Sequence, residues 1–294
     1  MSHKGIGKQR AIKVSQNIDK SETKTEFEAA PLPANEAARN ARVLRSGVMD
    51  VHQEDRYGLY VDLAKLITDC PVAYTGLLDD DRQFFLAKDF NGLLDADEVP
   101  RHLTLCQYAL GSTQPMIVPD LREHPKLKHN PLVTASPNWV FWGAYPLVTQ
   151  DGLVLGTLCT VDYKPRSMEP FQIEQMQALA NNLTLLVTLQ MEERDAVTER
   201  MAKLAAYFHR NHPDLRPSEL ENFLNLCSGQ PVNRQELERL AQWGIVALDN
   251  NAPDLTAKGR EIQAEHGLHA ATFRRQALAQ RTAVEIEDLF AMID

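Results

Sequence analysis

The chain has 294 residues, of which 44% are hydrophobic, and it carries a formal net charge of −9. This composition supplies a sizeable core for one or two domains, while the acidic surface disfavours non-specific contact with nucleic acid or anionic membranes. No apolar run approaches the ~20 residues that a membrane span needs, and the N-terminus lacks the apolar segment of a secretion signal, so we expect a soluble cytoplasmic protein. The four cysteines are widely spaced, which predicts free thiols rather than a disulfide framework or a zinc site.

Residues 1–34 are polar, with too few apolar side chains to form a core. We interpret them as a disordered tail. The alternative is a basic arm that contacts nucleic acid or an acidic partner, but acidic residues offset most of its cations.

From Asn35 onward, apolar residues recur at spacings of three and four, which predicts two helices that end at Pro71. Residues 72–78 and 83–88 then read as strands around an acidic turn at residues 79–81. Three adjacent carboxylates suggest Mg²⁺ or Ca²⁺, but the ligands of those ions normally alternate along a loop and converge from several positions. We therefore predict a solvated hairpin tip and no metal site.

A short helix around Cys106 is expected to pack on these strands, with Gly111 as its left-handed C-cap. The connection of residues 120–138 contains several prolines and no clear periodicity. A loop of this length within a compact domain is usually functional or disordered.

Two apolar runs, residues 139–149 and 153–161, meet across Asp151-Gly152, which is a strong hairpin signal. With the earlier strands they predict an α+β fold, in which helices flank an antiparallel sheet of five or six strands within residues 72–162. Alternation along the first run separates two sets of side chains. One set is Trp139, Phe141, Gly143 and Tyr145, and the other is Val140, Trp142 and Ala144.

Five short motifs follow one another in this region: Cys106-Gln107-Tyr108-Ala109-Leu110, Val118-Pro119-Asp120, His124-Pro125, Asn130-Pro131-Leu132-Val133 and Leu155-Gly156-Thr157-Leu158-Cys159. In this order and spacing they resemble the GAF family of small-molecule sensor domains. The resemblance implies a GAF-like domain over residues 35–192, whose 120–138 connection closes over a ligand pocket. It identifies no ligand or cofactor, and it places the candidate ligand-binding residues at Cys106, Asp120, Asn130, Trp142, Thr157 and Cys159.

The chain departs from the family where Ala144-Tyr145-Pro146-Leu147 replaces the usual Gly-Ala-Pro-Leu. Larger side chains there would fill the cavity, and the domain would then only pair with partners. Some GAF relatives reduce free methionine sulfoxide or attach a pigment through cysteine, but their cysteine patterns differ from those around Cys106 and Cys159. We interpret both thiols as packing residues between helix and sheet.

Residues 171–210 contain neither Gly nor Pro, which permits a long helix. An approximate heptad seam that includes Leu183 runs along it and is interrupted at Gln190 and Arg194. The segment is therefore either one helix or two joined near residues 190–195. We expect the seam to join a homodimer, the alternative being that the chain turns back and covers the seam itself.

After a connecting helix over residues 193–212, residues 213–294 are expected to form a helical domain. Its order of helix, helix, two short strands and the helix Ala257–Glu265 is similar to a winged helix, and further helices are expected beyond residue 270. Glu236 and Glu238 in the would-be recognition helix, Arg234–Trp243, repel phosphate, so a protein partner is favoured over DNA.

No hydrolase or nucleotide-binding motif is present, and the paired histidines lack further zinc ligands. We therefore expect a protein that is not an enzyme. It would be a signal-transduction protein whose GAF-like domain binds a small molecule or mediates dimerisation, and whose C-terminal domain contacts a partner. A GAF-regulated DNA-binding transcription regulator is the alternative, followed by a free methionine sulfoxide reductase.

Overall fold

The structure is a computed structural model that describes residues 27–50, 54–93, 96–249 and 252–268. The chain divides into two compact units, Met1–Met191 and Glu192–Asp294. Within the described residues, no helix has both the length and the apolar composition of a membrane span.

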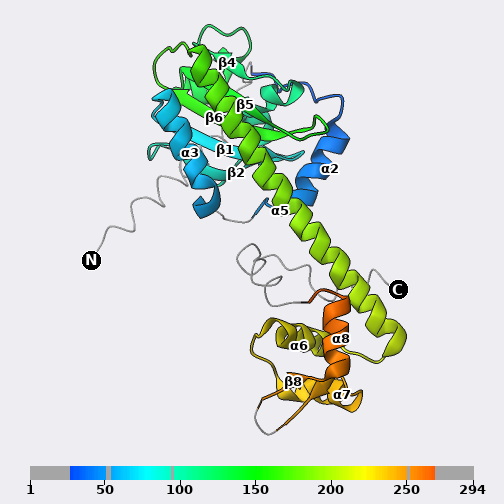
Figure 1. The fold of residues 1–294 in the computed structure, drawn as a ribbon. Helices are drawn as coiled ribbons and strands as arrows, with labels where there is room; N and C mark the ends of the chain where they lie inside the picture. Colours follow the sequence, from blue (N-terminus) through cyan, green and yellow to red (C-terminus); the bar gives the residue numbers. More distant parts are fainter. Residues whose placement is uncertain (1–26, 51–53, 94–95, 250–251, 269–294) are drawn as a thin grey trace, which may run out of the picture. The chain divides into compact units, whose positions relative to one another are not determined.

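A six-stranded antiparallel sheet forms the centre of the first unit (Figure 1). Its strands are β1 (Val72–Leu78), β2 (Arg82–Asp89), β3 (Glu98–Pro100), β4 (Met116–Val118), β5 (Phe141–Val148) and β6 (Val154–Asp162), in the order β3-β2-β1-β6-β5-β4. The acidic segment between β1 and β2 is a hairpin turn, in which the Asp79 carboxylate accepts the backbone N–H groups of Asp81 and Arg82 at 2.9 and 2.7 Å. The predicted α+β architecture is confirmed.

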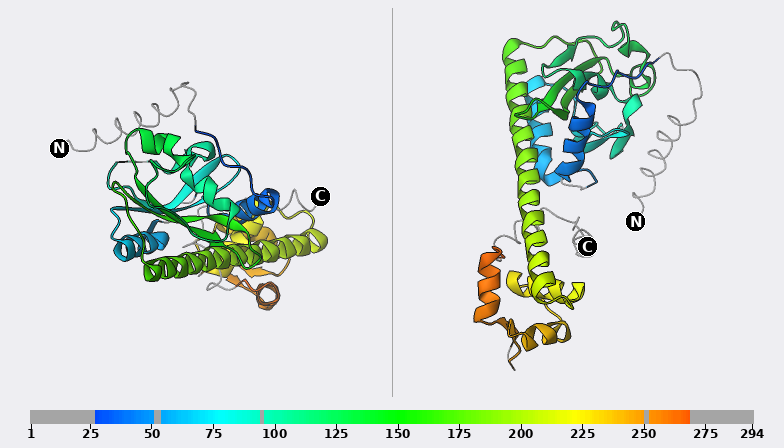
Figure 2. Two further views of the ribbon diagram at one scale, coloured as in Figure 1. Left: turned by 90° about the horizontal axis from the view of Figure 1, so that it is seen from above. Right: turned by 90° about the vertical axis from the view of Figure 1, so that its right-hand side faces the viewer.

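Three helices pack on one face of the sheet (Figure 2). They are α2 (Glu36–Ser46), α3 (Glu54–Thr68) and the first part of α5 (Pro170–Asn211). Alternate strand residues, among them Leu77 and Tyr145, contribute to this layer of the core. Tyr145 therefore packs beneath the helices and does not fill the space under the 120–138 connection, contrary to our expectation.

The apolar seam of α5 belongs to this core, since Met176, Ala180 and Leu183 are 0% exposed. The sheet of the same chain thus covers the stripe that we expected to meet a second copy. α5 is one helix without a break near residue 190. Gln190 interrupts the seam but is buried, and its Oε1 accepts hydrogen bonds from the Tyr57 hydroxyl at 2.7 Å and from Arg56 at 2.8 Å.

Short elements and the long connection cover the other face. They are the 3-10 helices η1 (Arg101–Leu103), η2 (Leu105–Gly111) and η3 (Leu127–His129), and the single-turn helix α4 (Pro131–Thr134). The helix expected around Cys106 is the 3-10 helix η2, whose first turn is capped by the Thr104 hydroxyl. Gly111 lies inside η2 and is not a left-handed cap, because the chain leaves η2 through Ser112 in an extended conformation.

Trp139 lies on the same side of the sheet as Trp142, although alternation had separated them. The reason is that β5 begins at Phe141, so the pleat of the strand does not extend back to Trp139.

Residues 27–30 contact η2, so the prediction of a disordered tail is wrong for these residues; residues 1–26 lie outside the described part. The Phe27 and Tyr108 rings lie 6.0 Å apart, and the Ala30 N–H donates to Gln107 Oε1 at 2.9 Å. The Tyr108 hydroxyl donates to the Glu28 carbonyl. The phenol and amide groups of η2 hold a segment whose own composition predicts no structure.

The second unit has its own core, to which Leu204 and Phe208 of α5 contribute. Its other elements are α6 (Pro217–Ser228), η4 (Arg234–Leu237), α7 (Glu238–Gln242), β7 (Val246–Ala247), β8 (Asp254–Leu255) and α8 (Ala257–Glu265). The predicted order of elements is observed, but the would-be recognition helix is split into η4 and α7. The helices expected beyond residue 270 lie outside the described residues.

Candidate functional site

The candidate site is an apolar layer between the sheet and the segment from η2 to α4, which we call the connection-side cluster. Aromatic side chains, aliphatic side chains and two thiols make up this layer, and all of them are buried. Its members are Val72, Tyr74, Leu78, Phe85, Phe90, Leu105, Cys106, Ala109, Leu110, Val118, Leu121, Leu127, Val133, Trp139, Trp142, Ala144, Val154, Cys159 and Val161.

Four polar side chains form a chain of contacts inside this cluster. The Tyr74 hydroxyl lies 3.4 Å from Cys106 Sγ, and Cys106 Sγ lies 3.6 Å from Cys159 Sγ. Cys159 Sγ donates in turn to Thr157 Oγ1 at 3.2 Å. None of the four residues is more than 2% exposed. β1, η2 and β6 thus bring together a phenol, two thiols and a hydroxyl in an otherwise apolar layer.

Burial and hydrogen bonding act differently on these groups. Burial raises the pKa of Tyr74 well above its ordinary value, because the phenolate would lose its hydration. Burial also opposes ionisation of both thiols. Hydrogen bonding with Cys159, Thr157, Tyr74 and Thr104 outweighs burial at Cys106 and lowers the pKa of that thiol, whereas the pKa of Cys159 is raised. Cys106 is therefore the thiol of the pair that ionises first.

Trp142 supplies a buried hydrogen-bond donor to the cluster. Its side chain is 0% exposed, and its indole N–H forms no hydrogen bond with the described residues. The indole N–H nevertheless interacts with the Tyr74 phenol and lowers the pKa of that phenol against the effect of burial. Trp142 therefore directs an unpartnered donor into the polar part of the cluster.

The two remaining predicted residues lie elsewhere and have structural partners. Asn130 caps α4, since its Oδ1 accepts the Leu132 N–H at 2.8 Å, and its Nδ2 donates to the Leu103 carbonyl at 2.9 Å. Asp120 lies near the surface, where its carboxylate pairs with Arg122. The structure thus brings Cys106, Trp142, Thr157 and Cys159 together and leaves Asn130 and Asp120 outside the group.

No signal in the sequence marks Tyr74 as a member of this group. It stands directly opposite Cys159 in the β1–β6 pairing, a register that a run of seven strand residues does not disclose. Tyr74 can be identified as the neighbour of Cys159 only when the register of β6 against β1 is known.

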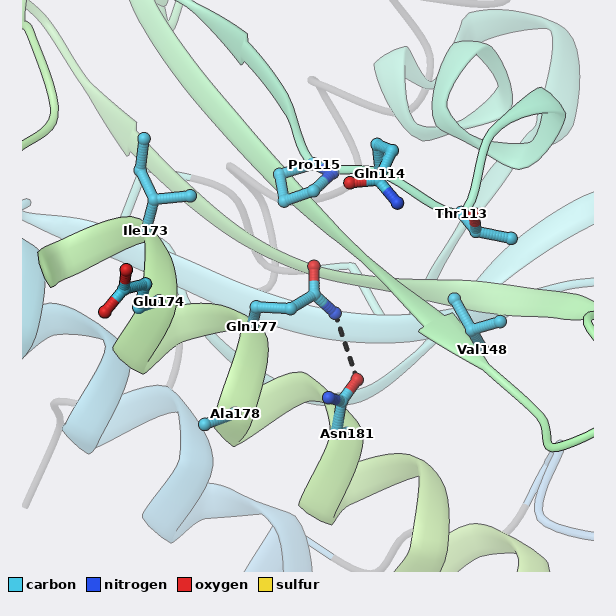
Figure 3. Close-up of a pocket in the computed structure, with 9 residues that line it drawn as sticks. All are labelled: Thr113, Gln114, Pro115, Val148, Ile173, Glu174, Gln177, Ala178 and Asn181. Carbon is cyan, nitrogen blue, oxygen red and sulfur yellow. Dashed lines mark hydrogen bonds between the residues drawn. The ribbon is translucent and has the colours of Figure 1, made fainter. Parts of the chain in front are cut away.

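A hollow of about 560 Å³ lies between α5 and the segment that leads into β4 (Figure 3). Gln177 and Asn181 lie along its α5 wall, joined by a hydrogen bond of 3.0 Å, and Thr113 to Pro115 face them. No predicted site residue lines it. Its walls come from segments some 60 residues apart, each with an ordinary surface composition, so no sequence signal marks it.

Comparison with known proteins identifies the central part of the chain. Residues 60–188 match the family model described as GAF domain, which confirms the resemblance seen in the motifs. This match ends before the second unit and lends no support to its winged-helix-like resemblance.

A cyclic di-GMP phosphodiesterase from Pseudomonas aeruginosa is 32% identical over 136 residues, which are 46% of this chain and 23% of that enzyme. The chain thus spans about a quarter of the length of this relative. Among solved structures, a domain of a two-component sensor histidine kinase protein from Sinorhizobium meliloti is 20% identical with a TM-score of 0.39, covering 49% of this chain and 96% of that one. The PixJ GAF domain from Thermosynechococcus elongatus is 15% identical with a TM-score of 0.40, covering 62% and 99%.

The Pseudomonas relative also corrects one prediction. We expected a protein that is not an enzyme, because no catalytic motif was recognised. The relative that matches the GAF-like part of the chain is named as an enzyme, which contradicts that expectation. The expectation rested on the lack of a catalytic motif in this chain. A missing motif does not exclude an activity, and the relative named as an enzyme is a longer protein.

Proposed function

We propose that the GAF-like domain is the sensing part of a signalling protein and that its ligand enters the connection-side cluster. The supporting observation is the buried, unpartnered indole N–H of Trp142. A buried donor without a partner costs roughly 1–3 kcal/mol. A ligand that places an acceptor on this N–H would remove that cost, which gives the site a preference for such a ligand.

The cluster favours an uncharged, mostly apolar ligand. Its own polar groups around Trp142 are the Tyr74 phenol, the thiols of Cys106 and Cys159 and the Thr157 hydroxyl, with no cation among them. An unpaired charge in such surroundings is strongly unfavourable. A planar molecule with one carbonyl or ring-nitrogen acceptor fits this chemistry, whereas a phosphate ester does not.

Entry requires part of the covering layer to move, because side chains fill the cluster. Hydrogen bonds join the parts of that layer to one another, including Asn130 Nδ2 to the Leu103 carbonyl at 2.9 Å and the Trp139 N–H to the Leu132 carbonyl at 2.8 Å. We propose that Asn130 acts as a latch of the site rather than as a ligand contact. Asp120 then plays no direct part in binding.

The likeness to a cyclic di-GMP phosphodiesterase leads us to propose that the sensed state controls turnover of that second messenger. Because the apolar cluster disfavours a phosphate ester, we propose that cyclic di-GMP takes part in the regulated reaction and does not bind in the sensing pocket. Incubation of the purified chain with cyclic di-GMP and a divalent cation, followed by chromatography, tests whether the chain itself carries the hydrolytic activity.

For the second unit we propose a protein partner. Arg234 donates to the backbone carbonyls of Leu248 and Asp249 at 2.8 and 3.0 Å, and Arg239 donates to that of Asp214, so both cations are used inside the unit. Glu238 is exposed beside them. This arrangement suits a partner with a basic surface better than DNA.

We also propose a homodimer, through a face of α5 other than the predicted seam. Leu185 and Leu189 are 49% and 48% exposed and lie one turn apart. On the neighbouring helix α3, Leu59 and Leu66 are 63% and 78% exposed. Covering these four leucines would give a second copy its contact area.

A thermal-shift screen with neutral aromatic ketones, amides and lactams tests the sensing proposal, with cyclic di-GMP as the anionic comparison. We expect a neutral compound to raise the melting temperature of the wild type but not of Trp142→Phe, which keeps a ring and loses the N–H. Trp243→Phe, which changes a tryptophan of the second unit, is the matched control and should respond like the wild type. An equal response of Trp142→Phe would contradict the proposed site.

A further inference from the structure

We infer that Cys106 and Cys159 form a reversible disulfide and make the connection-side cluster an oxidation-sensitive site. Their sulfur atoms lie 3.6 Å apart, on η2 and on β6. A disulfide requires about 2.05 Å, so a local adjustment of about 1.5 Å closes the bond. This inference does not depend on the proposed ligand.

Cys106 and Cys159 differ from the other two cysteines in that their sulfur atoms lie next to each other, and not in their exposure. All four cysteines are free and buried, so none has an advantage in access. Cys70 Sγ contacts the Thr68 carbonyl at 3.8 Å, and Cys227 belongs to the other unit. Among the described residues, only Cys106 and Cys159 have sulfur atoms in contact.

The surroundings assign the two thiols different roles. Cys106 Sγ lies 3.4 Å from the Tyr74 hydroxyl and 3.6 Å from Cys159 Sγ, and hydrogen bonding there favours its thiolate, which is the nucleophilic form. Cys159 stays protonated and lies within reach of the oxidised sulfur. We therefore assign Cys106 as the attacking thiol and Cys159 as the resolving thiol.

The oxidant we propose is a hydroperoxide, with hydrogen peroxide as the simplest member. The Cys106 thiol loses its proton, the thiolate attacks one peroxide oxygen, the O–O bond breaks, and a sulfenic acid and hydroxide form; the hydroxide takes up the released proton and becomes water. The Cys159 sulfur then attacks the sulfenic sulfur and displaces its oxygen, which leaves as water after taking up the Cys159 proton. Two thiols and one hydrogen peroxide thus give one disulfide and two waters, and a dithiol reductant reverses the change.

The bond would fix the covering layer to the sheet. η2 carries Cys106, and it also holds residues 27–30 through Gln107 and Tyr108. In the reduced protein only side-chain packing and hydrogen bonds hold η2 over β6. Oxidation would replace a contact between residues 53 apart in the chain by a covalent link, and the cluster would then open less readily.

The test uses the full-length chain, reduced, desalted and then exposed to hydrogen peroxide. We expect the number of thiols titrated under denaturing conditions to fall from four to two. A peptide map should show one cross-link between the peptides that contain Cys106 and Cys159, and dithiothreitol should restore all four thiols.

Matched variants assign the roles. The double variant Cys70→Ala/Cys227→Ala should lose both remaining thiols, whereas Cys159→Ala should stop at a sulfenic acid on Cys106 that dimedone traps. If Cys159→Ala does not fold, the wild-type peptide map decides by itself. Four intact thiols after prolonged exposure, a bond to Cys70 or Cys227, or a link between two chains would overturn the inference.

Discussion

A β-carbon added to Gly156 would lie 2.0 Å from the carbonyl oxygen of Gly76 and 2.8 Å from the Cα of Leu77. Real β-carbons do not approach backbone atoms so closely. β1 and β6, the two central strands of the sheet, therefore pair at this point only because position 156 has no side chain. The same pairing sets Tyr74 opposite Cys159, so it also positions the candidate site.

We predict that Gly156→Ala lowers the free energy of unfolding of the first unit by about 2–3 kcal/mol, because the central strands must separate locally. Urea unfolding in a Trp243→Phe background measures this, since the remaining tryptophans then lie in the first unit. Gly58→Ala is the matched control. Its β-carbon meets nothing within 4 Å in the interior of α3, so it should stabilise the protein by about 0.5–1 kcal/mol. An equal response of the two variants would refute the steric argument.

Two tyrosines of α3 make hydrogen bonds of equal length to α5, and they differ in burial. The Tyr57 hydroxyl donates to the buried Gln190 at 2.7 Å, and the Tyr60 hydroxyl donates to Asn182 at 2.7 Å in an exposed setting. We expect Tyr57→Phe to cost about 1 kcal/mol and Tyr60→Phe less than about 0.5 kcal/mol, because water replaces only the exposed bond. If Tyr60→Phe lowered the free energy of unfolding as much as Tyr57→Phe, burial would not determine how much each hydrogen bond contributes.

Glu36 makes the stability of the first unit depend on pH in the acidic range. Burial would raise its pKa, but the hydrogen bonds and charges of Arg39 and Arg101 lower the pKa from 4.5 to about 2. Because the folded-state pKa is depressed, this stabilisation is present above pH 4.5 and is lost as the pH falls towards 2. Melting curves across that range should show a smaller acid-induced decrease for Glu36→Gln than for the wild type. Glu174→Gln, at an exposed position, should leave the decrease unchanged.

The proposed dimer predicts different outcomes for two neighbouring faces of α5. Leu185→Glu/Leu189→Glu should convert a dimeric mass in light scattering to a monomeric one while the melting temperature changes little. Leu183→Glu places a charge in the core and should instead unfold the first unit. A monomeric wild type at micromolar concentration would refute the dimer.

Local sequence signals predict some elements of the fold, whereas other elements depend on contacts between distant residues. The hairpin at Asp151-Gly152 and the helix Ala257–Glu265 rest on local signals and were predicted correctly. The seam of α5 was misassigned because an apolar stripe looks the same whether a sheet or a second helix covers it. The 3-10 form of η2 and the ordering of Phe27 depend on tertiary partners. The contact between Cys106 and Cys159 also depends on tertiary structure, because the two residues are 53 positions apart in the chain.

The most direct test of the sensing proposal observes the donor itself. In protein labelled with ¹⁵N at its three tryptophans, the indole signal that disappears in Trp142→Phe is that of Trp142. Titration with the neutral compound that gives the largest thermal shift should move this signal downfield, as an acceptor engages the N–H, while that of Trp243 stays in place. Saturable binding that leaves the Trp142 signal unmoved would contradict the proposed site.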